Sequence, residues 1–123
     1  MIAHNSRILV VDDDKSVRKG HERLLRSMGY TVETAENGKE ALWMLVTREF
    51  GCVISDYSMP PGMTGYGLLV EVREHLAQDT PFILTSSQMD DHLRTRALQA
   101  GANACLAKES ITPELLGEIF QKI

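Results

Sequence analysis

The stretch RILVVDDDKSVRKGHERLLRSMG, residues 7–29, contains the unit from which the fold of this chain can be predicted. It begins with a continuous apolar run, RILVV (7–11), which is typical of a strand covered on both faces. From Val17 to Met28 the apolar residues keep helical spacing, and Gly29 predicts the end of that helix. A covered strand followed by an amphipathic helix is the building unit of a parallel α/β sheet.

The same strand–helix unit recurs four more times along the chain. Further strands are predicted at residues 30–35, 52–55, 81–86 and 104–107. Apolar positions at helical spacing follow each of them, at about residues 41–46, 68–76, 90–100 and 115–123. Five units in strict alternation predict an α/β fold. Its parallel sheet should carry helices on both faces, because right-handed crossovers place them there.

Length, composition and charge narrow the class of protein. A chain of 123 residues, 43% hydrophobic and 24% charged, fits one globular domain, which we place at residues 1–123. The net charge of −4 argues against direct nucleic-acid binding, which needs a basic face. No apolar run approaches the ~20 residues of a membrane span. The N-terminus MIAHNSR lacks the apolar core of a signal peptide, so we expect a cytoplasmic protein without membrane association.

Several conspicuous side chains are expected to have structural roles only. Cys52 and Cys105 both lie in apolar runs, which favours buried free thiols over a disulfide or a metal pair. Trp43 lies next to core positions of the second helix, and we expect it to be partly buried. His21 falls on a predicted polar helix face, so we expect it at the surface.

Acidic, hydroxyl and basic side chains stand where the predicted strands end. They are Asp12, Asp13 and Asp14 after the first strand, Asp56 after the third, Ser86 after the fourth and Lys108 after the fifth. Because such sheets bind ligands at the carboxyl ends of their strands, we expect these side chains to converge. A helix cap needs one side-chain oxygen. Asp14 can supply it, which leaves Asp12 and Asp13 without a structural role.

The acids suggest a metal site and a nucleophile. Carboxylates crowded together at neutral pH raise one another's pKa unless a cation lies among them. Oxygen ligands without His or Cys favour a hard cation, and we predict Mg²⁺. Asp56 is the candidate nucleophile, because it stands alone after the central strand and the loop sequence CVISDYSMPPGMTG (52–65) stiffens and bends the backbone around it. A carboxylate beside Mg²⁺ and a lysine can attack phosphorus and form an aspartyl phosphate.

Over roughly residues 6–122, the chain resembles the receiver domain of two-component response regulators. ILVVDDD resembles that family's first strand and acidic pair, VISDYSMP its phosphoacceptor segment, and GANACLAK its fifth strand with the lysine. The spacings from Asp56 to Ser86 and to Lys108, 30 and 52 residues, are similar to those of the chemotaxis receivers. The resemblance implies a flavodoxin-like three-layer sandwich with five helices and a five-stranded parallel sheet of order 2-1-3-4-5.

The same resemblance implies a phosphorelay switch with Asp56 as phosphoacceptor. Asp12, Asp13, Asp56 and the backbone carbonyl of Ser58 would bind Mg²⁺. The phosphoryl group would come from a sensor histidine kinase or a phosphotransfer protein. Phosphorylation would change the surface formed by the fourth helix, the fifth strand and the fifth helix. Such a domain is not an enzyme in the usual sense, because it promotes only its own phosphorylation and dephosphorylation.

The resemblance implies roles for the remaining candidate residues as well. Lys108 would pair with the phosphoryl oxygens, and Ser86 would hydrogen-bond to one of them after transfer. Ser87 would be the small residue beside the phosphate, and Cys105 occupies the output-switch position. Thr85 should point opposite to Ser86 in a strand, so we interpret it as a core or back-face residue.

Some features depart from the family pattern. The loop MPPGMTG is one residue longer than the commoner form, which predicts a bulge at Pro61–Gly62. The family usually has an aromatic residue at Cys105 and a proline after the lysine, where this chain has Glu109. We therefore expect intact phosphorylation chemistry and altered output coupling. Movement on phosphorylation should fall mainly on the Ser86–Asp91 loop and the fourth helix.

Two other classes of function remain as alternatives. One is a Mg²⁺-dependent phosphatase with an aspartyl-phosphate intermediate. Such enzymes usually carry a second acid two residues after the nucleophile, where this chain has Ser58. The other is a pseudo-receiver that is not phosphorylated and only binds partners, which would suit Cys105 and Glu109. The sequence also leaves open a stand-alone receiver or a part of a larger regulator or hybrid kinase, with an unknown output partner.

Overall fold

The computed structural model describes residues 1–60 and 62–123. Strands and helices alternate along the chain as the sequence predicts. The elements are β1 (Arg7–Val11), α1 (Lys15–Ser27), β2 (Thr31–Ala35), α2 (Gly38–Thr47), β3 (Cys52–Asp56), α3 (Gly65–Val70), the π-helix η1 (Glu71–His75), β4 (Phe82–Ser86), α4 (Asp91–Gln99), β5 (Ala104–Ala107), the 3-10 helix η2 (Lys108–Ser110) and α5 (Pro113–Lys122).

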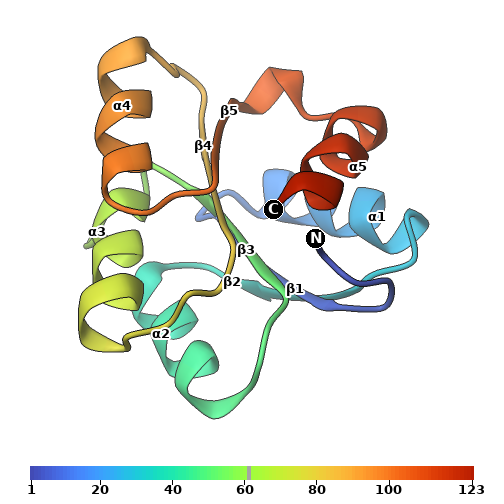
Figure 1. Ribbon diagram of the computed structural model, residues 1–123, viewed down its shortest axis with the longest axis horizontal. Coiled ribbons are helices and arrows are strands. Elements are labelled where there is room, and N and C mark those ends of the chain that lie inside the picture. The colour runs from blue at the N-terminus through green and yellow to red at the C-terminus, as the bar shows by residue number, and fades with distance from the viewer. Residues whose placement is uncertain (61) are drawn as a thin grey trace.

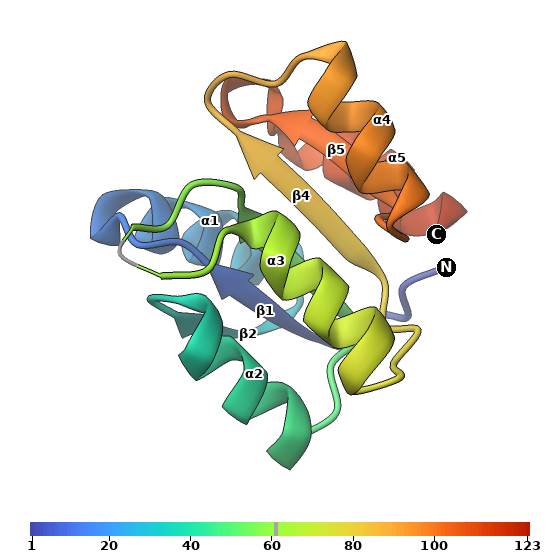
Figure 2. The same ribbon diagram turned by 90° about the vertical axis from the view of Figure 1, so that its left-hand side faces the viewer.

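The five strands form one parallel sheet in the order β2-β1-β3-β4-β5. Helices α2, α3 and α4 lie on one face of this sheet, and α1 and α5 lie on the other (Figure 1). The view onto the first of these faces shows the three helices side by side in front of the strands (Figure 2). The predicted flavodoxin-like sandwich is therefore confirmed, including the strand order.

The core consists of two apolar clusters, one on each face of the sheet. Leu9 and Val11 of β1 pack in the cluster beneath α2, α3 and α4, whereas Ile8 and Val10 pack in the cluster beneath α1 and α5. Successive side chains of a strand point to opposite faces, so a strand covered on both faces needs apolar residues at every position. This is why β1 is a continuous apolar run rather than an alternating one.

Short polar side chains fix where the helices begin. Asp14 Oδ1 accepts hydrogen bonds from the backbone N–H groups of Ser16 and Val17, at 2.8 and 3.3 Å, which confirms its predicted capping role. Gly29 follows α1 with φ of +98°, a left-handed conformation that favours glycine and ends the helix. Of the three acids after β1, Asp14 therefore caps α1, whereas Asp12 and Asp13 do not cap this helix.

Two of the predicted exposures are wrong. Trp43 is 62% exposed, because α2 turns Ala41, Met44 and Leu45 toward the core and Trp43 away from it. His21 is half-buried on α1, and burial lowers the pKa of its imidazole. Helical spacing predicts the central line of a buried face, but the neighbouring elements decide how far burial extends to either side.

The predicted bulge at Pro61–Gly62 includes Pro61, which lies outside the described residues.

Both cysteines agree with the prediction. Cys52 and Cys105 are buried free thiols, and burial raises the pKa of each.

Among residues 1–60 and 62–123, no helix is both long enough and apolar enough to span a membrane.

Candidate functional site

The carboxyl edge of the sheet brings three carboxylates together. Strands β1 and β3 are neighbours, with Val11 opposite Ser55, so Asp12 and Asp56 leave the sheet side by side. One carboxylate oxygen from each of Asp12, Asp13 and Asp56 lies within 4.8 Å of the others. Residues more than forty positions apart in the chain thus form one acidic cluster.

The surroundings of Asp12 fit a cation. Asp12 is 1% exposed, and its Oδ1 accepts a hydrogen bond from the Asp14 backbone N–H at 2.9 Å. Within the described part of the chain, the buried Oδ2 has one charged partner, the Lys108 ammonium group 3.0 Å away, so a single lysine faces three carboxylates. A buried carboxylate oxygen is costly unless a cation or a donor compensates it. The cluster offers only oxygen ligands, two from buried residues and one from the exposed Asp13, which suits Mg²⁺.

Lys108, the first residue of η2, supplies the positive charge on the protein side. Its Nζ lies 3.0 Å from Asp12 Oδ2 and 3.2 Å from Asp56 Oδ2, forming an ion pair with each. Burial by itself lowers the pKa of this ammonium group, but its contacts with Asp12 and Asp56 outweigh burial and raise the pKa. Lys108 is therefore a fixed cation at the edge of the cluster.

Asp56 is buried beside one group of like charge and one of opposite charge. It is 5% exposed, and burial raises the pKa of its carboxyl group. The nearby charge of Asp12 raises the same pKa further, while Lys108 acts in the opposite direction. The charged form of Asp56 thus lacks full compensation from the protein, and an added cation would favour it.

The loop after Asp56 approaches that residue closely. The Gly65 backbone N–H donates a hydrogen bond of 2.7 Å to the Tyr57 carbonyl, which folds the loop back over the end of β3. A Cβ atom at Gly65 would overlap the Asp56 carbonyl oxygen, so this position requires glycine. The sequence motif around Asp56 therefore serves to hold the carboxylate in a tight turn.

The three candidate serines border one cavity beside the acidic cluster. This cavity has a volume of about 430 Å³ and is lined by Tyr57, Ser58, Ser86, Ser87, Gln88, Asp90, His92, Leu93 and Arg96. Ser86 Oγ accepts a hydrogen bond of 3.1 Å from the Gln88 backbone N–H, so it is engaged with its own loop. Thr85 is buried and donates to the Ser55 carbonyl at 3.3 Å, in agreement with a core role.

Cys105 lies inside the protein, beneath α4. Its side chain belongs to the same apolar cluster as Leu93 and Ala97, and its Sγ is 3.9 Å from the Arg94 carbonyl oxygen. The position at which the resemblance implies an output switch is thus filled by a small buried side chain.

Two arginines contribute to the site without having been predicted. Arg18 Nη1 donates a 2.8 Å hydrogen bond to the Asp12 backbone carbonyl and so ties α1 to the acidic loop. Its place one turn after the Asp14 cap is the only sequence signal for this role. Arg96 of α4 lies 4.7 Å from the ring centroid of Tyr66 in α3, a cation–π contact between the two helices. Thirty positions separate this pair, and no local pattern indicates it.

Comparison with known proteins agrees with this geometry. Residues 8–120 match the response regulator receiver domain family. The chain is 34% identical over 119 residues to the chemotaxis protein CheY of Pseudomonas aeruginosa, covering 95% of this chain and 94% of that protein. It is also 34% identical over 112 residues to the probable transcriptional regulator ycf27 of Cyanidium caldarium, but spans 44% of that longer relative.

Solved structures give the same result. The chemotaxis protein CheY4 of Vibrio cholerae superposes with a TM-score of 0.86 at 31% identity, covering 98% of this chain and 99% of that one. The response regulator TrrA of Thermotoga maritima, solved in complex with Mg²⁺-BeF, has a TM-score of 0.82 at 32% identity, with 96% and 99% covered. This chain belongs to the response regulator receiver domains of two-component signalling.

Proposed function

We propose that residues 1–123 form one receiver domain that accepts a phosphoryl group on Asp56 and passes on the signal through its surface. The observation that carries this proposal is the cluster of Asp12, Asp13 and Asp56 oxygens within 4.8 Å, with Lys108 Nζ at 3.0 and 3.2 Å from two of these residues. Histidine kinases or phosphotransfer proteins are the partners of this family, so a phosphohistidine is the proposed donor.

In the proposed transfer, an Asp56 carboxylate oxygen attacks the phosphorus. The new oxygen–phosphorus bond forms as the bond between phosphorus and the donor histidine nitrogen breaks, and the electron pair leaves with that nitrogen. Asp56 must be ionised to attack, and Lys108 favours that form. The same ammonium group can then pair with the phosphoryl oxygens. Charge neutralisation and positioning account for most of the catalysis of such transfers.

Asp12, Asp13, Asp56 and the Ser58 carbonyl are the proposed ligands of Mg²⁺. When bound, the ion would neutralise negative charge on the phosphoryl group. Arg18 holds the Asp12 backbone and thereby positions this ligand. The Ser86 hydroxyl, whose oxygen accepts from the Gln88 N–H, would donate its own hydrogen to a phosphoryl oxygen and draw the loop before α4 toward Asp56.

Phosphorylation of the purified chain tests the proposal. Incubation with Mg²⁺ and acetyl phosphate should add one phosphoryl group, detected by intact-protein mass spectrometry and localised to Asp56. Asp56→Asn should abolish the addition, whereas Asp79→Asn, an exposed acid at the other edge of the sheet, should leave it unchanged. Equal phosphorylation of Asp56→Asn would overturn the assignment of the acceptor. A wild-type chain that is never modified, even by a cognate kinase, would favour the pseudo-receiver.

A further inference from the structure

The amino edge of the sheet carries a cavity that phosphoryl transfer does not use. It has a volume of about 570 Å³ and lies between the end of α2 and the loop before β4; its lining is Leu45, Val46, Thr47, Arg48, Glu49, Phe50, Gln78, Asp79 and Thr80. Strands β3 and β4 begin beside it, whereas Asp56 stands at the other end of β3. A five-residue strand is roughly 17 Å long, so the length of the sheet separates the two sites.

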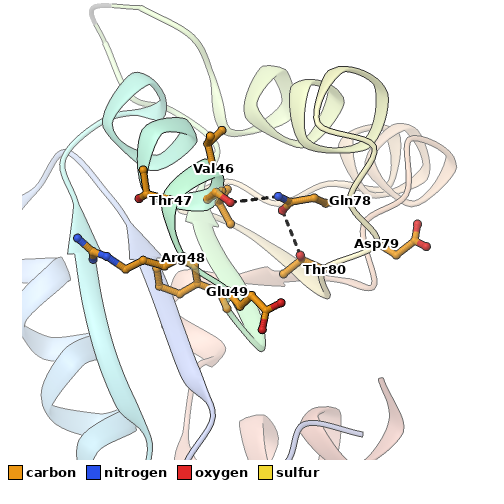
Figure 3. A pocket seen from close by; sticks show the side chains of 9 residues that line it. Val46, Thr47, Arg48, Glu49, Gln78, Asp79 and Thr80 are labelled. Atoms are coloured by element: carbon orange, nitrogen blue, oxygen red, sulfur yellow. Dashed lines mark hydrogen bonds between the residues drawn. The ribbon is translucent and has the colours of Figure 1, made fainter.

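One hydrogen bond joins the two walls of the cavity, and a second lies within the loop before β4. Gln78 Nε2 donates to the Leu45 carbonyl at 3.1 Å, and Thr80 Oγ1 donates to Gln78 Oε1 at 3.3 Å (Figure 3). The polar groups of the Gln78 side chain are thus engaged within the protein. Apolar contributions come from Leu45, Val46 and Phe50. The cavity is therefore preformed and has an apolar part.

An exposed apolar strip leads into this cavity. Trp43 and Val46, one turn apart on α2, are 62% and 65% exposed, and Val46 also lines the cavity. Single exposed apolar residues are ordinary on a protein surface, but neighbouring ones that continue into a cavity are characteristic of binding surfaces. Tryptophan is also among the residues that contribute most energy to protein interfaces.

The charges around the cavity favour a cationic ligand. Glu49 and Asp79 are exposed, and neither forms a salt bridge within the part of the chain that the structure describes. The carbonyl groups at the end of α2 add negative partial charge. Arg48 also lines the cavity; it pairs with Glu33, which Arg7 shares, and its guanidinium lies 6.0 Å from the centroid of the Trp43 ring. Arg73 lies near Asp79, but its guanidinium donates to the carbonyls of Gly101 and Gln78.

We infer that Trp43, Val46 and the adjoining cavity form a docking surface, here called the α2 surface, for a basic amphipathic segment of a partner protein. Apolar side chains of that segment would cover Trp43 and Val46. A lysine or arginine beside them would enter the cavity and meet Glu49 and Asp79. The carboxylates of Glu49 and Asp79, unpaired within the described residues, disfavour nucleic acids and anionic membranes, which bind basic surfaces. Because the α2 surface is remote from Asp56, the contact anchors a partner whether or not Asp56 is phosphorylated.

Trp43 provides the assay, because it is the only tryptophan in the chain. The probes are two synthetic amphipathic peptides without tryptophan, one of leucine and lysine and the other with glutamate in place of every lysine. The lysine peptide should shift the Trp43 emission to shorter wavelength in a saturable manner as the indole becomes buried. The glutamate peptide should not. Mg²⁺ and beryllofluoride, which mimic phosphorylation of Asp56, should leave the affinity for the lysine peptide unchanged.

Charge reversal localises the binding. The double variant Glu49→Lys/Asp79→Lys should bind the lysine peptide about tenfold more weakly, since each exposed charge contact contributes up to ~1 kcal/mol. Val46→Ser should also weaken binding, whereas Glu118→Lys on α5 is the matched control and should have no effect. Equal binding of both peptides, or an equal loss in the double variant and in Glu118→Lys, would overturn the inference.

Discussion

Replacing Lys108 by methionine tests how much its positive charge stabilises the cluster of Asp12, Asp13 and Asp56. Methionine keeps an unbranched side chain of similar length and removes the ammonium group. In the variant, Asp12 and Asp56, which are 1% and 5% exposed, would face each other without a protein cation. We expect a lower free energy of unfolding in the absence of metal, together with tighter binding of Mg²⁺, because the remaining site is more negative.

The expected size follows from the burial of the pair. Removing one partner of a buried ion pair costs about 3–5 kcal/mol, because a buried charge remains uncompensated. The Lys108 side chain is 21% exposed, so water can partly replace it and we expect about 3 kcal/mol. Mg²⁺ at ten times its dissociation constant then restores about 1.4 kcal/mol by mass action.

Urea denaturation at pH 7.5, with EDTA or with millimolar Mg²⁺, measures both effects on the same samples. Lys122→Met, which removes an exposed lysine near the end of α5, is the control and should resemble the wild type in both buffers. The gain in unfolding free energy on adding Mg²⁺ should be larger for Lys108→Met than for the wild type. If the variant were as stable as the wild type in EDTA, or gained no more from Mg²⁺, the assignment of Lys108 as counter-charge to this cluster would be wrong.

Three further predictions concern neighbouring residues. In EDTA, Asp56→Asn should be more stable than the wild type near pH 7, because the raised pKa of Asp56 destabilises its charged form in the fold. The difference should vanish as the pH falls below 3.8, and a pH-independent difference would contradict this. Ser86→Ala should still be phosphorylated, but the change in amide exchange in α4 should shrink; an unchanged response would exclude Ser86 as the sensor. Arg96→Gln should lose the contact with Tyr66 and about 0.5–1 kcal/mol in urea denaturation, whereas Arg23→Gln on α1 should not.

Local patterns in the sequence were sufficient for the alternating strands and helices and for the candidate acids, hydroxyl group and lysine at the strand ends. A strand covered on both faces must be apolar throughout, and a helix that packs on a sheet must repeat its apolar residues at helical spacing. The caps Asp14 and Asp90 act on N–H groups two or three residues away, so they too are encoded locally. The acids at the strand ends stood out because a single cap cannot account for all of them.

The order of the strands required more than these patterns. Alternation of strands and helices is compatible with several orders, and the order 2-1-3-4-5 came from the resemblance to a family. That order places β1 beside β3, so Asp12 meets Asp56 across 44 positions of sequence, and it brings Lys108 to both. Such contacts depend on how whole elements pack, and no short segment contains that information.

The sequence by itself therefore determined the five strand–helix units and the types of side chain that follow the strands. Only the tertiary structure decided which groups are compensated and which are exposed. Lys108 pairs with both Asp12 and Asp56, Arg96 contacts the Tyr66 ring, and Trp43 of α2 is largely exposed. The physical reason is that solvation and charge compensation are set by every neighbour in space, and most of those neighbours are distant in the chain.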